Sequence, residues 1–174
     1  MRNAQTLLTQ YAAYHRDRRN IATHFVGVPM IVLAVGVLLA GVHFVVNGVD
    51  ITAAWLAYAV ATLWYLSRGL AVGLATSAVV GVLMAVAHPL AGGSTASWLG
   101  WGVGLFAVGW VIQFVGHYYE GRKPAFVDDL IGLLVGPMFV VAEWMFMLGW
   151  NKPLLQAIEA EVGPTVIRDL AHPA

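Results

Sequence analysis

Residues 69–87 read GLAVGLATSAVVGVLMAVA, a run of 19 residues without a single charge. Small, β-branched and aliphatic side chains alternate here without the polar stripe of a surface helix. A helix needs roughly 20 apolar residues to cross the hydrocarbon core of a bilayer. The stretch therefore predicts a membrane-spanning helix.

Four more apolar segments flank it, and the shortest has 16 residues: residues 25–46, 51–66, 98–116 and 130–150. Backbone N–H and C=O groups have no water to bind in hydrocarbon. A helix pairs these groups within itself, whereas the edge of an open sheet leaves some of them without a hydrogen bond. We therefore predict an all-α polytopic bundle of four or five spans, without strands. Residues 1–174 are expected to form one integral-membrane domain.

The composition agrees with this prediction. The chain is 60% hydrophobic and 10% charged, with a mean hydropathy of +0.76. Soluble domains carry about 25% charged residues. The net charge is zero, so the composition shows no excess of positive charge that would favour binding to nucleic acid. The absence of cysteine excludes disulfides and thiolate chemistry.

Both ends of the chain favour short amphipathic helices. Leu7, Leu8, Tyr11 and Tyr14 recur at helical spacing near the start. Near the end, residues 154–162 carry apolar side chains at the same spacing, as interfacial helices do. Close helix packing is expected at Gly69 and Gly73, and at Gly100 and Gly104.

Basic residues mark one face of the membrane. Arginine or lysine precedes the first segment and lies in two loops, at Arg68 and at Arg122 with Lys123. With five spans these positions share one face, so the positive-inside rule predicts a cytoplasmic N-terminus. The side on which the C-terminus lies depends on whether one segment is re-entrant.

The polar residues concentrate in two clusters at this predicted face. The first comprises residues 14–20 and His24, and the second comprises Gln113, residues 116–124, Asp128 and Asp129. We interpret Asp17 and its arginine neighbours as a solvated turn, with Asn20 capping the next helix. Polar residues are costly in a membrane protein, so their clustering predicts a site.

Three histidines belong to these clusters: His15, His24 and His117. Neutral imidazoles, with a carboxylate from Glu120, Asp128 or Asp129, suit Fe(II) or Zn(II). His15 and His24 are nine residues apart, which places them on opposite sides of a continuous helix. They share a metal only if the chain breaks between them, and residues 18–20 offer the break. The alternative is that these are ordinary interfacial histidines.

Other polar residues have two interpretations each. Glu143 is a candidate functional carboxylate inside the fifth segment, or a structural partner of Gln113 or an arginine. Arg122 and Lys123 either bind an anionic head group or only set the topology. His88 lies on the opposite face in a five-span arrangement, and its role stays open.

The two clusters resemble the signatures of a known family, the membrane-bound 2-hydroxy-fatty-acid dioxygenases. The first signature is similar to YHRDRRNIATHFVGVP at residues 14–29. The second is similar to GWVIQFVGH at residues 109–117, followed by Glu120, Arg122, Pro124, Ala125 and Asp128. Glu143 and the Leu148-Gly149-Trp150 ending also fit.

The resemblance implies a function. Members of this family use Fe(II) and O₂ to shorten a 2-hydroxy fatty acid by one carbon, and eukaryotic members do so in the endoplasmic reticulum during phytosphingosine breakdown. The alanine- and valine-rich composition resembles a bacterial protein, so we expect the inner membrane. His15, His24, His117 and Glu143 are the expected catalytic residues, and the three histidines with His88 are the candidate iron ligands.

The remaining expectations concern substrate and alternatives. The lipid-dissolved substrate is expected to contact Arg122, Lys123, Gln113 and Tyr14. The alternatives are a non-enzymatic transporter or lipid-binding protein, with Pro137 and the fifth segment forming a site, and a zinc-dependent lipid hydrolase. The oligomeric state is not predicted.

Overall fold

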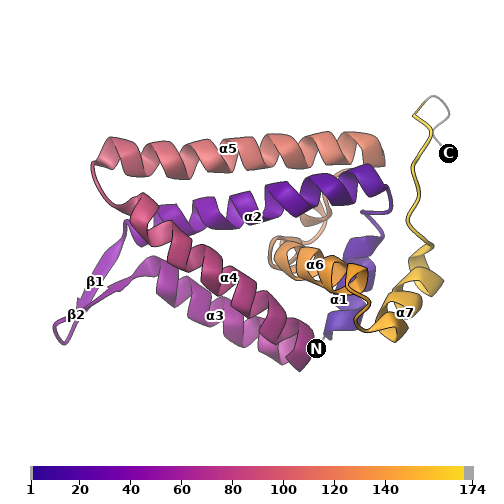
Figure 1. The fold of residues 1–174 in the computed structure, drawn as a ribbon, viewed down its shortest axis with the longest axis horizontal. Coiled ribbons are helices and arrows are strands. Elements are labelled where there is room, and N and C mark those ends of the chain that lie inside the picture. Colours follow the sequence, from indigo (N-terminus) through magenta and orange to yellow (C-terminus); the bar gives the residue numbers. More distant parts are fainter. Residues whose placement is uncertain (1, 171–174) are drawn as a thin grey trace. The chain divides into compact units, whose positions relative to one another are not determined.

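The computed structural model describes residues 2–170 and is mainly helical (Figure 1). Its elements in chain order are α1 (Ala4–Ala12), α2 (Arg18–Ala40), β1 (His43–Val46), β2 (Val49–Thr52), α3 (Ala53–Arg68), α4 (Leu70–Ala91), α5 (Thr95–Glu120), η1 (Ala125–Val127), α6 (Gly132–Met147) and α7 (Lys152–Val162). The predicted all-α class is confirmed.

Within residues 2–170, three helices are long enough and apolar enough by themselves to cross a membrane. Among the described residues, α2, α4 and α5 meet the requirements of length and hydropathy. Helices α6 and α7 meet them only as a pair, and the chain bends by 117° between them. Helix α3 has 16 residues and falls short. The described residues thus hold three candidate spans, or four with the bent pair, and four is the lower of the two numbers that we predicted; both counts are consistent with a membrane protein.

A hairpin follows α2, so the first segment is not a helix to residue 46. Helix α2 ends at Ala40, and β1 pairs with β2 in antiparallel register, with Val46 opposite Val49. Asn47 and Gly48 have positive φ angles of 52° and 79°, as the tight turn of a hairpin requires. The expectation of no strands was wrong because the rule on sheet edges applies within hydrocarbon, and not to a connection between helices.

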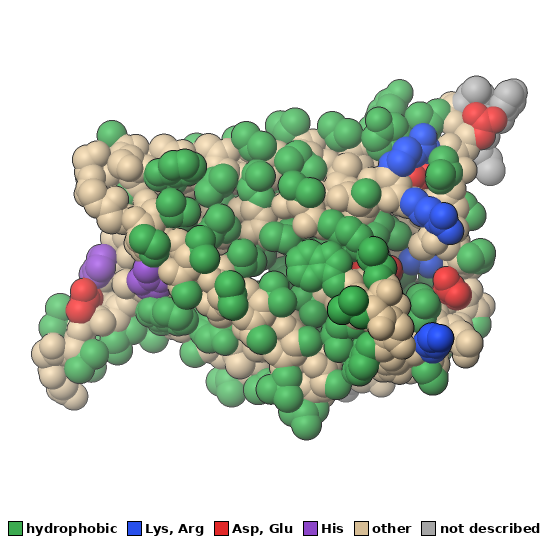
Figure 2. All heavy atoms as spheres, viewed as in Figure 1, with side chains coloured by type: hydrophobic (Ala, Val, Ile, Leu, Met, Phe, Trp, Pro, Cys, Tyr) green, Lys and Arg blue, Asp and Glu red, His purple; other side chains and the backbone are tan. Residues whose placement is uncertain are grey.

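By its internal contacts the chain divides into two units, the first formed by residues 1–28 and 111–174 and the second by residues 29–110. In the second unit, α3 and α4 pack against each other, and hydrophobic side chains cover them (Figure 2). A Cβ at Gly73 would lie 2.6 Å from the Tyr65 carbonyl oxygen, so this glycine permits the close approach. A Cβ added at Gly100 or Gly104 would meet no atom within 4 Å outside its own stretch of helix, so the close packing expected at this pair is not found.

In the first unit, α1 packs on α6 and α7. The predicted terminal helices are both present, and their apolar faces are buried within the protein at Leu7, Leu8 and Ile158. Phe139 of α6 is buried beneath α1 and stacks at a tilt against Tyr11. Lys and Arg side chains gather around α7 and the segment after it (Figure 2). This unit therefore holds most of the polar residues around a small core.

Candidate metal centre

The first unit brings together three histidines from three places in the chain. His15 lies in the turn after α1, His24 on α2 and His117 on α5, and all three are buried. One ligand atom from each lies within 4.8 Å of the other two. Among residues 2–170 this is the group of histidines and carboxylates compact enough to hold a metal ion.

A break in the chain makes this possible, although it does not lie where we predicted. Helix α1 ends at Ala12, the His15 N–H donates to the Ala12 carbonyl, and α2 begins at Arg18. The predicted break at residues 18–20 was wrong, as was the assignment of Asn20 as the helix cap. Asp17 precedes the helix instead, and its carboxylate accepts from the Arg19 N–H at 2.8 Å.

Backbone carbonyls fix the tautomers of two histidines. His15 Nδ1 lies 2.7 Å from the Tyr11 carbonyl oxygen, and His24 Nδ1 lies 2.9 Å from the Asn20 carbonyl oxygen. A carbonyl only accepts, so each Nδ1 carries the proton and each Nε2 presents a lone pair. Hydrogen bonds of this kind orient the histidine ligands of metal sites.

The two Nε2 atoms lie only 3.0 Å apart. Burial, with the neighbouring histidines, lowers the pKa of His15 well below its usual range, so its ring is neutral. Two unprotonated nitrogens facing each other at this distance repel unless a cation lies between them. The donor set therefore fits a transition-metal ion, since neutral imidazole is a common ligand for iron and zinc.

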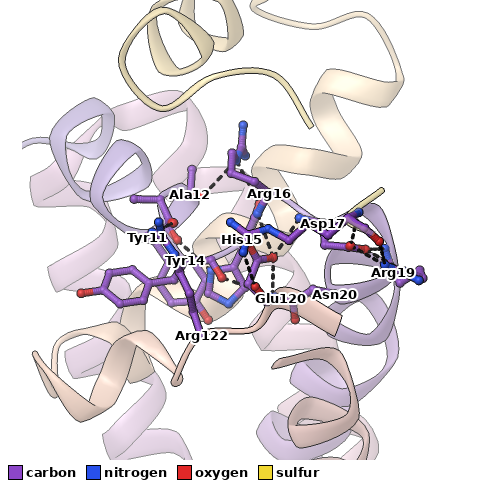
Figure 3. Close-up of polar contacts among 12 residues, drawn as sticks. Tyr11, Ala12, Tyr14, His15, Arg16, Asp17, Arg19, Asn20, Glu120 and Arg122 are labelled. Atoms are coloured by element: carbon purple, nitrogen blue, oxygen red, sulfur yellow. Dashed lines mark hydrogen bonds and ion pairs between the residues drawn. The ribbon is translucent and has the colours of Figure 1, made fainter. Parts of the chain in front are cut away.

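A buried carboxylate joins the turn to α5. Glu120 is 0% exposed, and its Oε2 accepts from the backbone N–H groups of Arg16 (3.0 Å) and Asp17 (2.8 Å). The Asn20 side-chain amide donates to the same oxygen at 3.1 Å and to the Tyr14 carbonyl at 3.2 Å. Figure 3 shows Glu120 among these donors.

Asp17 is buried and is not the solvated residue that we expected. Its carboxylate accepts from the Arg19 guanidinium and from the Arg168 backbone N–H. Burial by itself raises the pKa of Asp17, but these bonds outweigh it and lower the pKa to about 2. The Arg168 side chain also donates to the Glu120 carbonyl at 2.7 Å. Arg168, in the segment after α7, thus binds both the turn before α2 and the end of α5.

Gln113 lies one helical turn before His117 on α5 and is 3% exposed. Neither its amide nitrogen nor its amide oxygen has a hydrogen-bond partner. A buried amide without partners is costly and calls for an explanation by function or by a bound molecule. Its position beside His117 makes it a candidate for contact with a ligand.

The structure does not bring Glu143 or His88 into the group of three. Glu143 lies on α6, and its charge, together with that of Glu120, opposes the lowering of the Arg16 pKa by burial. This favours the pairing of Glu143 with an arginine. His88 makes its contacts within the second unit, where its ring nitrogens contact the Met84 carbonyl and the Thr52 hydroxyl and its ring stacks on Trp55.

Three of the four predicted head-group residues have partners on the protein, and Gln113 is the exception. Arg122 donates to the Ala13 carbonyl at 2.8 Å. Lys123 and the Tyr14 hydroxyl both contact the Asp128 carboxylate, at 2.5 and 2.8 Å. Tyr14 and Asp128 line a cleft of about 400 Å³ between α1 and the start of α6. A substrate carboxylate at Lys123 would have to displace Asp128.

Sequence reasoning missed Tyr11 and the linking role of Glu120. The Tyr11 ring stacks on the His15 ring with centroids 4.2 Å apart and planes 6° from parallel. The spacing of four residues between them was a signal that could have revealed the contact. The partners of Glu120 lie about a hundred positions away in the sequence, so no local signal existed.

Comparison with known proteins gives two matches. Residues 1–148 match the family model described as 2-hydroxy-palmitic acid dioxygenase Mpo1-like. The chain is also similar to the 2-hydroxy-palmitic acid dioxygenase MPO1 of Saccharomyces cerevisiae, with 30% identity over 156 residues that cover 87% of this chain and 85% of the relative. No solved structure matches this chain. All three clustered histidines lie within the matched residues.

Proposed function

Because this chain belongs to the Mpo1-like family of 2-hydroxy-palmitic acid dioxygenases, we propose that it is an Fe(II)-dependent membrane dioxygenase that shortens 2-hydroxy fatty acids by one carbon. The observation that carries the proposal is the buried group of His15, His24 and His117. Three neutral imidazoles leave coordination positions for other ligands, which oxygen chemistry requires.

These three histidines would hold the iron through one ring nitrogen each. When bound, iron would supply the activation of O₂ and a Lewis-acidic site for the substrate's carboxylate and 2-hydroxyl oxygens. The Tyr11 and Asn20 carbonyls orient the His15 and His24 rings. The burial of the group excludes bulk water, which protects reactive species from side reactions.

Other residues would bind the substrate. The unpartnered amide of Gln113 offers both a donor and an acceptor to the head group. Arg122, Lys123 and Tyr14 lie on the loop and turn beside the cleft and would guide an anionic head group. Glu143 would interact with the Arg16 charge and would not touch the substrate. His88 has no role in this proposal.

The membrane serves the substrate in this proposal. An amphiphilic 2-hydroxy fatty acid dissolves in the bilayer and would reach the site laterally. The apolar helices α2, α4 and α5 would hold the chain in a bacterial inner membrane, with the N-terminus in the cytoplasm.

The test is a metal and activity measurement on the purified protein in detergent. We expect one equivalent of bound iron, O₂ consumption that depends on 2-hydroxypalmitate, and pentadecanoic acid as the product. Palmitate without the hydroxyl is the control substrate and should not react. Bound zinc with hydrolysis of a lipid ester in the absence of O₂ would indicate a hydrolase, and a folded protein without metal or turnover contradicts the proposal.

Replacement of Gln113 by leucine tests its assigned role. The variant removes a buried amide without partners, so the substrate-free protein should become more stable, by about 1 kcal/mol. If the amide binds the head group, kcat/KM for 2-hydroxypalmitate should fall by about tenfold, the effect of one lost hydrogen bond to a charged group. Thermal unfolding and steady-state kinetics measure the two effects.

The matched control is Gln156→Leu, on the exposed face of α7. This change should alter neither stability nor kcat/KM by more than a small factor. A Gln113→Leu protein that loses stability and keeps its kcat/KM would show that the amide has a structural role.

A further inference from the structure

We propose that Glu120 is a positioning residue that sets the geometry of the three-histidine centre without binding the metal. This inference rests on the metal centre of the proposed function. It concerns a residue outside the group of three histidines. Its basis is the convergence of all three ligand-bearing segments on one buried carboxylate.

The first contact fixes His15. The Arg16 and Asp17 N–H groups, directly after His15, both donate to Glu120 Oε2. This turn belongs neither to α1 nor to α2, so no helical hydrogen-bond ladder holds it in place. The carboxylate therefore restrains the backbone that carries His15, together with the His15 N–H bond to the Ala12 carbonyl and the Val166 N–H bond to the Arg16 carbonyl.

The second contact fixes His24. Asn20 donates its side-chain amide to Glu120 Oε2, while its own carbonyl accepts from His24 Nδ1. The same amide nitrogen also reaches the Tyr14 carbonyl, just before His15. Asn20 thus transmits the position of Glu120 to both histidines of the N-terminal cluster.

The third connection joins Glu120 to His117, because both residues lie on α5. His117 and Glu120 are three residues apart and share one face of the helix. The distance between the ligands of α5 and those of the N-terminal segments is therefore set by the Glu120 contacts. A shift of that carboxylate would move His15 and His24 relative to His117.

The surroundings of Glu120 favour a carboxylate over an amide. All three groups at Oε2 are N–H donors, and Arg168 approaches Oε1 at 3.8 Å. A glutamine could meet the three donors only with its single oxygen, and its NH₂ group would then take the buried Oε1 position, facing the Arg168 guanidinium that the carboxylate attracts. Glu120 is also absent from the group whose ligand atoms lie within 4.8 Å of one another.

The experiment compares Glu120→Gln with the wild type, using Co²⁺ as the metal. Cobalt replaces iron or zinc at imidazole sites, and its visible absorption changes with coordination geometry. We expect about 10- to 100-fold weaker Co²⁺ binding, as for other outer contacts of metal ligands. The spectrum of the saturated variant should also differ from that of the wild type, which a general loss of stability would not cause.

Glu161→Gln makes the same chemical change at an exposed position of α7 and is the control. It should keep the wild-type affinity and spectrum. If Glu120→Gln does not fold, Asn20→Ala takes its place, because it removes one of the three donors and leaves the charge; a smaller shift of the same kind is expected.

Each outcome decides the proposal. A folded Glu120→Gln protein with wild-type affinity and spectrum overturns it, as does an unchanged Asn20→Ala protein where the first variant does not fold. A wild-type protein that binds no Co²⁺ overturns the metal centre and this inference together. A further outcome separates this inference from the proposed function. If Glu120→Gln shows the expected changes in Co²⁺ affinity and spectrum but the iron form does not turn over 2-hydroxypalmitate, the proposed substrate is wrong and the role of Glu120 is supported.

Discussion

Replacement of His117 by alanine should abolish stoichiometric metal binding and lower dioxygenase activity by at least about 100-fold, beyond the usual cost of losing an outer contact. His117 is the α5 member of the buried group, and no other side chain in that group comes from α5. His15 and His24 would then face each other alone. Metal analysis of the purified variant and O₂ uptake with 2-hydroxypalmitate measure the result.

His43→Ala is the matched control, because His43 lies exposed on β1 and pairs with Asp50. It should keep both metal and activity. His88→Ala gives a second comparison, since both His88 ring nitrogens are engaged within the second unit. A His117→Ala protein that keeps one equivalent of iron, or a His88→Ala protein that loses it, would refute the assigned ligand set.

Replacement of Gly116 by alanine should destabilise the protein by about 1–3 kcal/mol, the usual cost of overpacking. A Cβ at this position would clash with Thr23 Oγ1 and lie 2.5 Å from Asn20 Oδ1 and 3.3 Å from Asn20 Cα. These atoms belong to α2, so the two helices would have to separate at the level of the histidines. We therefore also expect metal affinity to fall by about tenfold or more.

Gly104→Ala is the control for this change, since Gly104 lies on the same helix and a Cβ added there would meet nothing within 4 Å. Alanine is favoured over glycine inside a helix by about 1 kcal/mol, so this variant should be as stable as the wild type or more so. Thermal unfolding in detergent and metal titration compare the two proteins. Equal stability and equal affinity in both would contradict the close approach at Gly116.

Much of the fold follows from local sequence. The apolar run at residues 69–87 lies almost entirely in one helix, α4, because its length and composition leave few other ways to satisfy the backbone in lipid. The hairpin at residues 43–52 was missed although its Asn47-Gly48 turn is a strong local signal. The error came from giving hydropathy precedence over turn chemistry.

The candidate site was only partly predictable. The sequence singled out His15, His24 and His117 as residues to consider, through their clustering and the family resemblance. It required a chain break between the first two, and the structure has one, at residues 13–17 instead of 18–20. The burial of Asp17 was unpredictable because the Arg168 N–H that binds it lies far along the chain.

The sequence by itself determined the helical membrane class and the residue types available for metal chemistry, because both depend on composition and local pattern. Only the tertiary structure decided that three histidines share a centre while His88 does not. It alone showed that Gln113 is buried without a partner and that Glu120 binds the turn before α2. These features depend on the close approach of α5 to α2 at Gly116, Asn20 and Thr23. No local sequence pattern specifies that distance, because it depends on residues about a hundred positions apart.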